Sequence, residues 1–348
     1  MLGPPLKPCL QIQGLKVLAA QPYFSVVIPT YNRLGRLRQV IAALEQQEYP
    51  SDAYEVIVIS DGSTDGTDAY LEALRSTMRL RWFPQPNRGP AAARNAGVKR
   101  AEGEVIVFID DDVVPEPQLL SEHARSHRDA GQDVVVLGPL LTPEGFEMNP
   151  WVRWEQEMLM KQYRALLRVD WPANARQFYT GNASLRRSHI LVAGGFDEGF
   201  RRAEDVELAY RLADKGLGFV FNIQAAGMHF AERSFRAWLD TAHTYGRNDV
   251  IFARDRNQKW LLSAVRQEFR DRHFLIRSLV RVCRGRSRLT WIVNSALKLA
   301  ADTATLLRAS DLERFAYSGL FNLQYYVGLL HELNDVNFLF KESLEKPI

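Results

Sequence analysis

The chain has 348 residues, of which 46% are hydrophobic and 24% charged, and its formal net charge is +3. This composition is typical of a globular protein with a large buried core, and two cysteines are too few for a disulfide framework. No uncharged stretch offers the roughly 20 apolar residues of a membrane-spanning helix, and the adjacent Pro4 and Pro5 argue against a signal peptide. We therefore expect a cytoplasmic protein and not an integral membrane protein.

Short apolar runs alternate with helical patterns from Phe24 to about Gly138. The runs at 56–59 and 105–109 are apolar on both faces, as parallel strands are when helices cover both sides of a sheet. The alternation predicts a Rossmann-like α/β layer. The predicted strands lie at 25–29, 54–60, 80–83, 105–109 and 133–137, with helices around 37–44, 69–74, 92–98 and 119–130.

The alternation stops after Gly138, and the remaining sequence contains no repeat or low-complexity segment. The patterns here predict a helix at 148–167, a loop or short strand at 177–188, a helix at 204–215, one strand at 219–230, and mostly helices from 235 onward. The sequence therefore predicts a loose arm at 1–22, an α/β domain at 23–233 and a helical C-terminal region at 234–348.

Polar segments directly follow three of the predicted strands, which is where ligands bind in open sheets of this type. They begin at Pro29, Asp61 and Asp110, and the last is a run of three aspartates, Asp110 to Asp112. Since adjacent carboxylates repel one another, a bound divalent cation is a natural compensation. The alternative is a solvated acidic turn before Pro115, but the position at a strand end favours a metal site.

Three further positions have both a structural and a functional interpretation. Asp61 stands in a turn that suits helix capping, yet its carboxylate points from a strand end towards the expected ligand crevice. Asp205 either caps the helix at 204–215 or acts as a general base in a partly desolvated cleft. His229, in an apolar stretch, is either a satisfied core residue or a metal ligand.

Taken together, these segments resemble the inverting family 2 glycosyltransferases, which have the fold called GT-A. The resemblance covers roughly residues 24 to 230, about three fifths of the chain. Each motif is modest alone, but seven of them in this order and spacing are specific. The motifs are Ser25-Val-Val-Ile-Pro-Thr-Tyr-Asn, Asp61-Gly-Ser-Thr-Asp-Gly-Thr, Asn87-Arg-Gly-Pro-Ala-Ala-Ala-Arg-Asn-Ala-Gly, Asp110-Asp-Asp, Thr180-Gly-Asn, Gly194-Gly-Phe-Asp and Glu204-Asp.

The resemblance implies a role for each matching position in the donor site. Asp61 would accept a hydrogen bond from the base, and Arg94 would lie near the diphosphate or steady the acidic loop. Asp112 would bind Mn²⁺ or Mg²⁺, with Asp110 and His229 completing the metal site, since a mixed carboxylate and imidazole shell suits such ions. The expected nucleotide-sugar contacts are Pro29, Thr30, Tyr31, Asn32, Asp61, Arg94, Asp110 and Asp111.

On the acceptor side, the resemblance implies that Asp205 is the catalytic base. The mechanism would be a single displacement at the anomeric carbon with inversion, while the metal and Arg94 stabilise the departing diphosphate. One departure is Ser60, which stands where many relatives have a second acid before Gly-Ser. The expected acceptor contacts are Thr180, Gly181, Asn182 and Glu204.

The sequence leaves other functions open. A retaining glycosyltransferase of similar fold would differ in product stereochemistry, and a non-catalytic nucleotide-sugar-binding module would be expected to lose an acid. A nucleotidyltransferase would want a glycine- and basic-rich phosphate loop, whereas Pro29-Thr-Tyr-Asn-Arg follows the first strand here. We expect UDP as the donor nucleotide, with GDP and dTDP as alternatives, and a glycan or lipid-linked glycan of cell-envelope, polysaccharide or glycolipid synthesis as the acceptor.

The aromatic residues on the acceptor side and the basic tail each have more than one interpretation. Trp151, Trp154, Trp171 and Tyr179 either stack on a sugar ring or belong to the core. The stretch from 259 to 308 has 11 Lys/Arg against three acids. Its helices either lie on the anionic inner face of the plasma membrane or pack on the catalytic domain or a second subunit. Nucleic acid is not expected, because no recognition motif is present.

Overall fold

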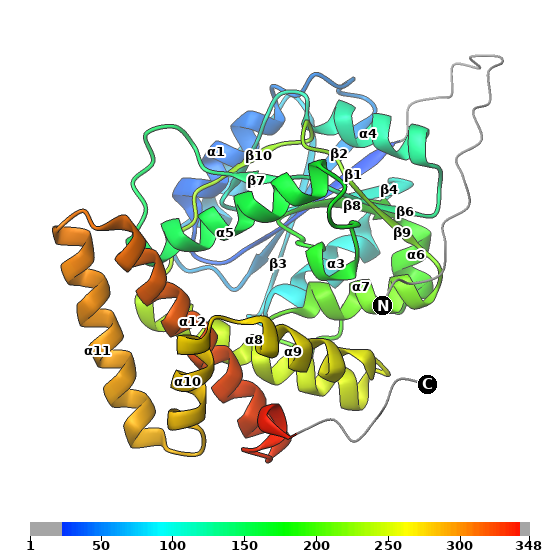
Figure 1. Ribbon diagram of the computed structural model, residues 1–348. Coiled ribbons are helices and arrows are strands. Elements are labelled where there is room, and N and C mark those ends of the chain that lie inside the picture. The colour runs from blue at the N-terminus through cyan, green and yellow to red at the C-terminus, as the bar shows by residue number, and fades with distance from the viewer. Residues whose placement is uncertain (1–22, 342–348) are drawn as a thin grey trace.

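The computed structural model describes residues 23–341, and the arm predicted for residues 1–22 lies outside this range. A mixed sheet with helices on both faces is followed by a group of long helices (Figure 1), as the sequence predicted. The strands are β1 (Phe24–Thr30), β2 (Tyr54–Asp61), β3 (Arg79–Gln85), β4 (Val105–Ile109), β5 (Val113–Pro115), β6 (Val134–Leu137), β7 (Leu140–Leu141), β8 (Asn182–Arg186), β9 (Gly218–Phe221) and β10 (Gly227–His229).

The large sheet has the strand order β3-β2-β1-β4-β8-β6-β9. All neighbouring pairs are parallel except the two that include β8, which is antiparallel to both β4 and β6. The carboxyl ends of β1, β2, β4 and β6 and the amino end of β8 therefore lie at one edge. We call this edge the catalytic edge. A small sheet has the strand order β5-β10-β7, and its strands β5 and β7 directly follow β4 and β6 of the large sheet in the chain.

Helices cover both faces of the large sheet because its central strands are apolar on both sides. Val26, Val56 and Val58 pack with Leu37 and Ile41 on one face, whereas their neighbours in sequence pack on the other face. The helices are α1 (Leu34–Leu44), α2 (Thr67–Ala73), α3 (Pro90–Arg100), α4 (Leu119–Ala130), α5 (Pro150–Leu167), α6 (Arg187–Val192), α7 (Glu204–Asp214), α8 (Phe235–Asp255), α9 (Trp260–Asp271), α10 (Phe274–Cys283), α11 (Ser287–Leu306) and α12 (Ser310–Leu333), with 3₁₀ turns at Ala175–Gln177 and Phe338–Phe340.

The single strand predicted for residues 219–230 is wrong. The chain instead forms β9, turns through Asn222, and then forms β10 in the small sheet. The Asn222 side chain is buried, where it donates to Ser126 Oγ at 2.9 Å and accepts from Gln224 N. Local hydrophobicity is alike on both sides of this turn, so the pattern alone did not reveal it. The break matters because it carries His229 to the catalytic edge.

The C-terminal region is built around the crossing of α8 and α12. The two helices approach so closely that a Cβ added at Gly246 would lie 1.9 Å from Tyr325 O, and one at Gly328 would lie 2.0 Å from His243 O. Trp238 is buried beside this crossing, between Trp154 and Tyr317. Within residues 23–341, no helix combines the length and the apolar character that crossing a bilayer requires.

Candidate active site

The catalytic edge brings together side chains that are far apart in the sequence. Because β1, β2 and β4 are parallel and in register, Thr30, Asp61 and the acidic loop 110–112 all follow strand ends at this edge. All three lie where ligands bind in open α/β sheets. The acidic loop turns at once into β5, and Val113 N donates to Asp110 O at 3.1 Å, which keeps the turn tight.

Two of the loop carboxylates are buried and already face a cation. Thr30 Oγ1 donates to Asp111 Oδ2 at 2.7 Å, and Arg33 Nη1 contacts Asp112 Oδ2 and lies 3.4 Å from Asp111 Oδ1. Burial raises the pKa of Asp111 to about 7, although Arg33 lowers it. The positive charge at the loop thus comes from Arg33, which was not among the predicted site residues.

His229 reaches the same loop from the small sheet. β10 pairs with β5 so that His229 stands opposite Val113, and His229 Nε2 lies 3.7 Å from Asp112 Oδ1. Phe230 N donates to Asp112 O at 2.9 Å, which fixes the backbone beside the imidazole. The ring of His229 thus stands beside the acidic loop and is partly exposed.

A divalent ion fits these residues in part. No group of three or more His, Cys, Asp or Glu side chains is arranged as a metal site in the described range 23–341. Asp112 and His229 nevertheless converge, and carboxylate with imidazole suits Mn²⁺-like ions. The remaining ligands would come from diphosphate oxygens and water, and Arg33, whose side chain is 42% exposed, would have to turn away from Asp112.

Arg94 joins the acidic loop to the start of α7. Its buried guanidinium donates from Nη2 to Asp110 Oδ1 at 2.6 Å and from Nη1 to Glu204 Oε1 at 2.7 Å. The pKa of Arg94 is raised overall, because burial lowers it by less than the charges of Asp110 and Glu204 raise it. The guanidinium therefore stays charged. Of the two expected roles for Arg94, this geometry is the one that steadies the acidic loop.

Asp205 follows Glu204 and is left without a cation partner of its own. Within the described chain its carboxylate accepts one hydrogen bond, from Val206 N at 2.8 Å. Burial and the neighbouring Glu204 raise the pKa of Asp205 to about 7, while Arg94 lowers it. A carboxylate of this kind is part ionised at neutral pH and can accept a proton, which is the property that a general base needs.

The nucleotide side of the edge is shaped by hydrogen bonds within the protein. Asp61 is buried, and its two oxygens accept from Arg88 N and Gly89 N at 2.9 and 2.8 Å. Asn32 has a positive φ of 53°, and its side-chain oxygen accepts from Thr64 N at 2.7 Å. These bonds join the three loops of the predicted nucleotide site. Pro29 lies near the end of β1, and Tyr31, which directly follows the strand, is exposed.

The predicted acceptor contact of Asn182 is not supported by its placement. Asn182 is buried, donates to Pro139 O and Ala225 O, and accepts at Oδ1 from His123 Nε2 across 3.0 Å. These bonds fill both ends of the amide, so it holds β8 in the core. The other three predicted acceptor contacts are placed as follows. Thr180 is buried, and Glu204 is paired with Arg94. Gly181 lies close to the acidic loop, since a Cβ added there would stand 3.2 Å from Asp110 Oδ2.

Asp205 influences two tyrosines, of which the sequence analysis considered only Tyr179. Tyr179 is half-buried, and burial together with the charge of Asp205 raises its pKa. Tyr245, on α8, has its pKa raised by burial and by Glu155 and Asp205. Glu155 in turn accepts from Arg233 Nη1 at 3.0 Å. The charge of Asp205 therefore acts on both tyrosines. Tyr245 and Arg233 were missed because they lie beyond the motifs.

The three tryptophans considered for sugar stacking have different surroundings. Trp154 is a core residue, packed edge-on against Trp238 at a ring distance of 5.7 Å. Trp151 donates from Nε1 to Arg233 O at 2.9 Å and packs on Phe235. Trp171 is exposed. The core interpretation therefore holds for Trp154.

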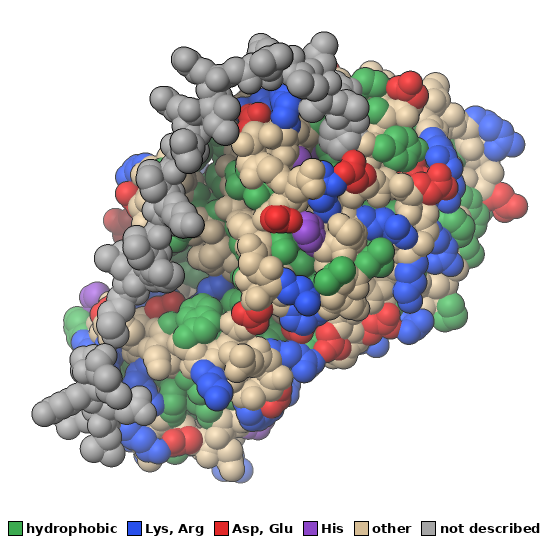
Figure 2. Space-filling view, turned by 90° about the vertical axis from the view of Figure 1, so that its right-hand side faces the viewer, with side chains coloured by type: hydrophobic (Ala, Val, Ile, Leu, Met, Phe, Trp, Pro, Cys, Tyr) green, Lys and Arg blue, Asp and Glu red, His purple; other side chains and the backbone are tan. Residues whose placement is uncertain are grey.

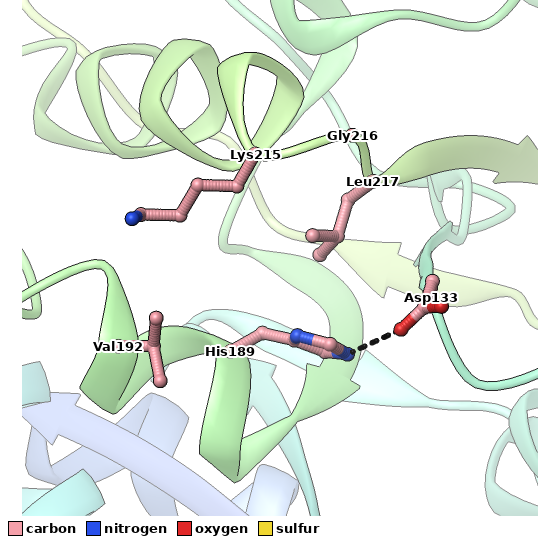
Figure 3. Close-up of a pocket in the computed structure, with 6 residues that line it drawn as sticks. All are labelled: Asp133, His189, Val192, Lys215, Gly216 and Leu217. Atoms are coloured by element: carbon pink, nitrogen blue, oxygen red, sulfur yellow. Dashed lines mark ion pairs between the residues drawn. The ribbon is translucent and has the colours of Figure 1, made fainter.

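A second concavity lies at the opposite edge of the sheet (Figure 3). It has a volume of about 270 Å³ and lies between α6, the end of α7 and the amino ends of β6 and β9. His189 Nε2 stands 3.3 Å from Asp133 Oδ1 there, with Lys215 pointing away into the opening. Strand amino ends are not where α/β sheets of this type bind substrate, so this concavity is separate from the candidate active site.

Comparison with known proteins finds glycosyltransferases. Residues 25–192 match the model of glycosyl transferase family 2. Validoxylamine A glucosyltransferase of Streptomyces hygroscopicus subsp. jinggangensis is 31% identical over 235 residues, which cover 60% of this chain and 55% of that protein. Glycosyltransferase AglE of Haloferax volcanii is 26% identical over 248 residues, covering 70% and 76%. The chain thus spans about half the length of the validoxylamine relative.

Solved structures extend the likeness to the fold. The mannosyltransferase PcManGT from Pyrobaculum calidifontis, in complex with GDP-Man and Mn²⁺, superposes with a TM-score of 0.60 at 20% identity, covering 90% of this chain and 88% of that one. TarS of S. aureus gives a TM-score of 0.52 at 18% identity, covering 85% and 55%. Residues 25–192 thus match the model of glycosyl transferase family 2, and the chain shares its fold with these two solved structures.

Proposed function

We propose that this protein is an inverting, metal-dependent glycosyltransferase that moves a sugar from a nucleotide diphosphate, UDP in the first instance, to an acceptor hydroxyl. The observation that carries the proposal is the Arg94 bridge. By binding Asp110 and Glu204 at once, it holds Asp205 beside the acidic loop at the catalytic edge. Donor and acceptor groups would thus meet between one anchored loop and one anchored helix.

The proposed chemistry needs few participants. Asp205 takes the proton of the acceptor hydroxyl while that oxygen bonds to the anomeric carbon, and the bond from that carbon to the diphosphate breaks. The diphosphate leaves with the electron pair, and the configuration inverts. Glu204 is engaged by Arg94, so Asp205 is the acid that remains to act as base. Inversion requires no covalent sugar–enzyme intermediate.

Asp112 and His229 are the residues proposed to hold the divalent ion. When bound, the ion supplies positive charge to the departing diphosphate. The solved mannosyltransferase of the same fold contains Mn²⁺ and GDP-Man, which supports an ion and a nucleotide sugar here too. Asp110, Asp111, Thr30 and Asp61 would border the donor. The name of TarS, a poly(ribitol-phosphate) β-N-acetylglucosaminyltransferase, is consistent with a polymeric or glycan acceptor.

The test is donor binding measured by thermal shift with UDP-, GDP- and dTDP-sugars, with and without Mn²⁺. We expect one donor class to raise the Tm of the wild type only when Mn²⁺ is present, and Asp112→Ala to abolish the shift. Asp133→Ala, at the opposite edge of the sheet, is the matched control and should keep it. An absence of any shift in the wild type would overturn the donor and the metal proposals together.

Product stereochemistry tests the mechanism separately. With the donor class known, the anomeric configuration of the product is read by NMR against that of the donor. Inversion agrees with a single displacement, whereas retention would exclude it. A retaining outcome would still leave a glycosyltransferase. A protein that binds the donor but transfers no sugar to any acceptor would be a binding module.

A further inference from the structure

The helical region contains a segment with an unusual charge. Residues 272–301, here called the basic segment, contain seven Lys or Arg and no Asp or Glu. The segment comprises α10 and most of α11, at the periphery of the molecule in Figure 1. By contrast, the face shown in Figure 2, on the other side of the molecule, carries acidic and basic side chains intermixed. The charge imbalance is thus local.

The same segment exposes large apolar side chains. The Trp291 side chain is 70% exposed and the Leu299 side chain is 69% exposed. Other apolar side chains of the segment, such as Ile276, Val280 and Cys283, are buried against the rest of the helical region. The exposed large apolar residues of the segment are Phe274, Leu275, Val282, Trp291, Ile292 and Leu299.

Helix geometry places Trp291 and Leu299 on one outward strip of α11. Arg288, Trp291, Ser295 and Leu299 follow one another at spacings of three or four residues and are all exposed. Residues at such spacings share a helix face. The opposite face of α11 packs on α12, where Ala301 and Ala304 are buried. The outward strip therefore combines an aromatic ring, an aliphatic side chain and a cation without a covering element from the described chain.

We infer that the basic segment is a docking surface for the headgroups of an anionic lipid bilayer. Tryptophan settles at the interface between headgroup and acyl chain, aliphatic side chains insert, and arginines attract anionic headgroups. Charge complementarity selects this occupant over a second copy of the chain. A two-fold contact through the strip would set arginines against arginines, because such an interface brings the same patch of both copies together.

This inference stands apart from the proposed transferase activity, because binding to lipid needs neither donor nor metal. The full chain is sedimented with vesicles of phosphatidylcholine alone and with 30 mol% phosphatidylglycerol, a composition we choose as about that of an anionic leaflet. We expect binding to the anionic vesicles only, weakened at high salt because the attraction is screened. No binding to either vesicle would overturn the inference.

Two sets of variants locate the surface. Trp291→Ser with Leu299→Ser, and separately Arg281→Gln with Arg288→Gln, should each weaken vesicle binding at least about tenfold, since apolar insertion and charge both contribute. Val192→Ser, on the exposed part of α6, is the matched control and should bind like the wild type. All four substituted positions are exposed, and an unchanged Tm confirms that each variant folds.

The competing occupant gives a distinct result. If the strip instead binds a second copy, light scattering will show a dimer that Trp291→Ser converts to a monomer, and the anionic vesicles will not sediment the protein. That combination contradicts the lipid inference. Equal vesicle binding by the wild type and by both variant pairs would also contradict it, because the binding would then arise elsewhere on the molecule.

Discussion

The α/β domain and the helical region use charge in opposite ways. In the α/β domain, cations are buried and paired with carboxylates, as Arg94 is with Asp110 and Glu204. In the helical region, five of the six arginines of the basic segment are exposed, and residues 272–301 contain no acidic residue. Buried pairs fix a small number of side chains in one geometry, whereas an exposed set of like charges acts as a field over a surface. The first arrangement suits chemistry and the second suits docking.

The largest effect is expected from removing the proposed base, which should lower the reaction rate and so test the chemistry assigned to the α/β domain. Asp205→Asn should lower kcat about 10²–10⁴-fold, because positioned proton transfer contributes that much. Donor binding should be nearly unchanged, since the Asp205 carboxylate bonds within the described chain to Val206 N and not to the acidic loop or to Asp61. Asp214→Asn, at the far end of the same helix, where Asp214 accepts from Gln258, is the control and should retain most activity. A similar kcat for both variants would assign the base elsewhere.

The buried cation Arg94 should also contribute strongly to the free energy of unfolding. Arg94→Met leaves Asp110 and Glu204 facing each other without their cation, and breaking a buried pair in this way costs about 3–5 kcal/mol. Urea unfolding measures the change in free energy. Arg88→Met removes an exposed ion pair with Glu198 and should cost less than about 1 kcal/mol. Equal losses would show that the Arg94 bridge is not what holds the site together.

The helical region should depend on close packing instead of charge. Gly246→Ala would place a Cβ 1.9 Å from Tyr325 O, so α8 and α12 must separate. Such overpacking costs about 1–3 kcal/mol, measured as a lower free energy of unfolding. Gly35→Ala in α1 has nothing within 4 Å of the added Cβ and should be neutral or slightly stabilising. A neutral Gly246→Ala would mean that the helix crossing adapts readily.

The fold was predictable where a local pattern determines it. Strands apolar on both faces predicted the central sheet, and the rule for strand carboxyl ends correctly predicted that Thr30, Asp61 and the acidic loop share one edge. The division of residues 219–230 into β9 and β10 was not predictable, because both halves are apolar and only their pairing partners differ.

The candidate site was predictable only in part for a similar reason. Motifs identified the acids, but long-range packing decides which partner each one meets. Arg33 reads as a surface residue after the first strand, yet it lies against Asp112. Asn182 reads as an acceptor contact, yet its amide is engaged inside the core by Pro139, Ala225 and His123. Tyr245 comes 40 residues after Asp205 in sequence, and only the packing of α8 brings it to the base.

The pH dependence of the reaction is the finest probe of the contrast, because it reports the environment of one carboxylate. Burial and Glu204 raise the pKa of Asp205 from 3.8 to about 7. A base must be ionised to accept a proton, so the active fraction is about half at pH 7 and falls about tenfold for each pH unit below the pKa. On the alkaline side of pH 7 the rate should level off, because Asp205 is then fully ionised.

The measurement is kcat/KM against pH. At each pH the Mn²⁺ concentration is first varied to find saturation, so that the pH profile reports proton transfer and not metal binding. An acid limb near pH 7 that Asp205→Asn removes agrees with a buried base. Glu204→Gln, which takes away the like charge next to Asp205, should move that limb to lower pH, since a neighbouring negative charge is one of the two causes that raise the pKa. A limb near pH 4 in the wild type would instead describe an exposed carboxylate. In that case the α/β domain would use its charges at the surface, as the helical region does.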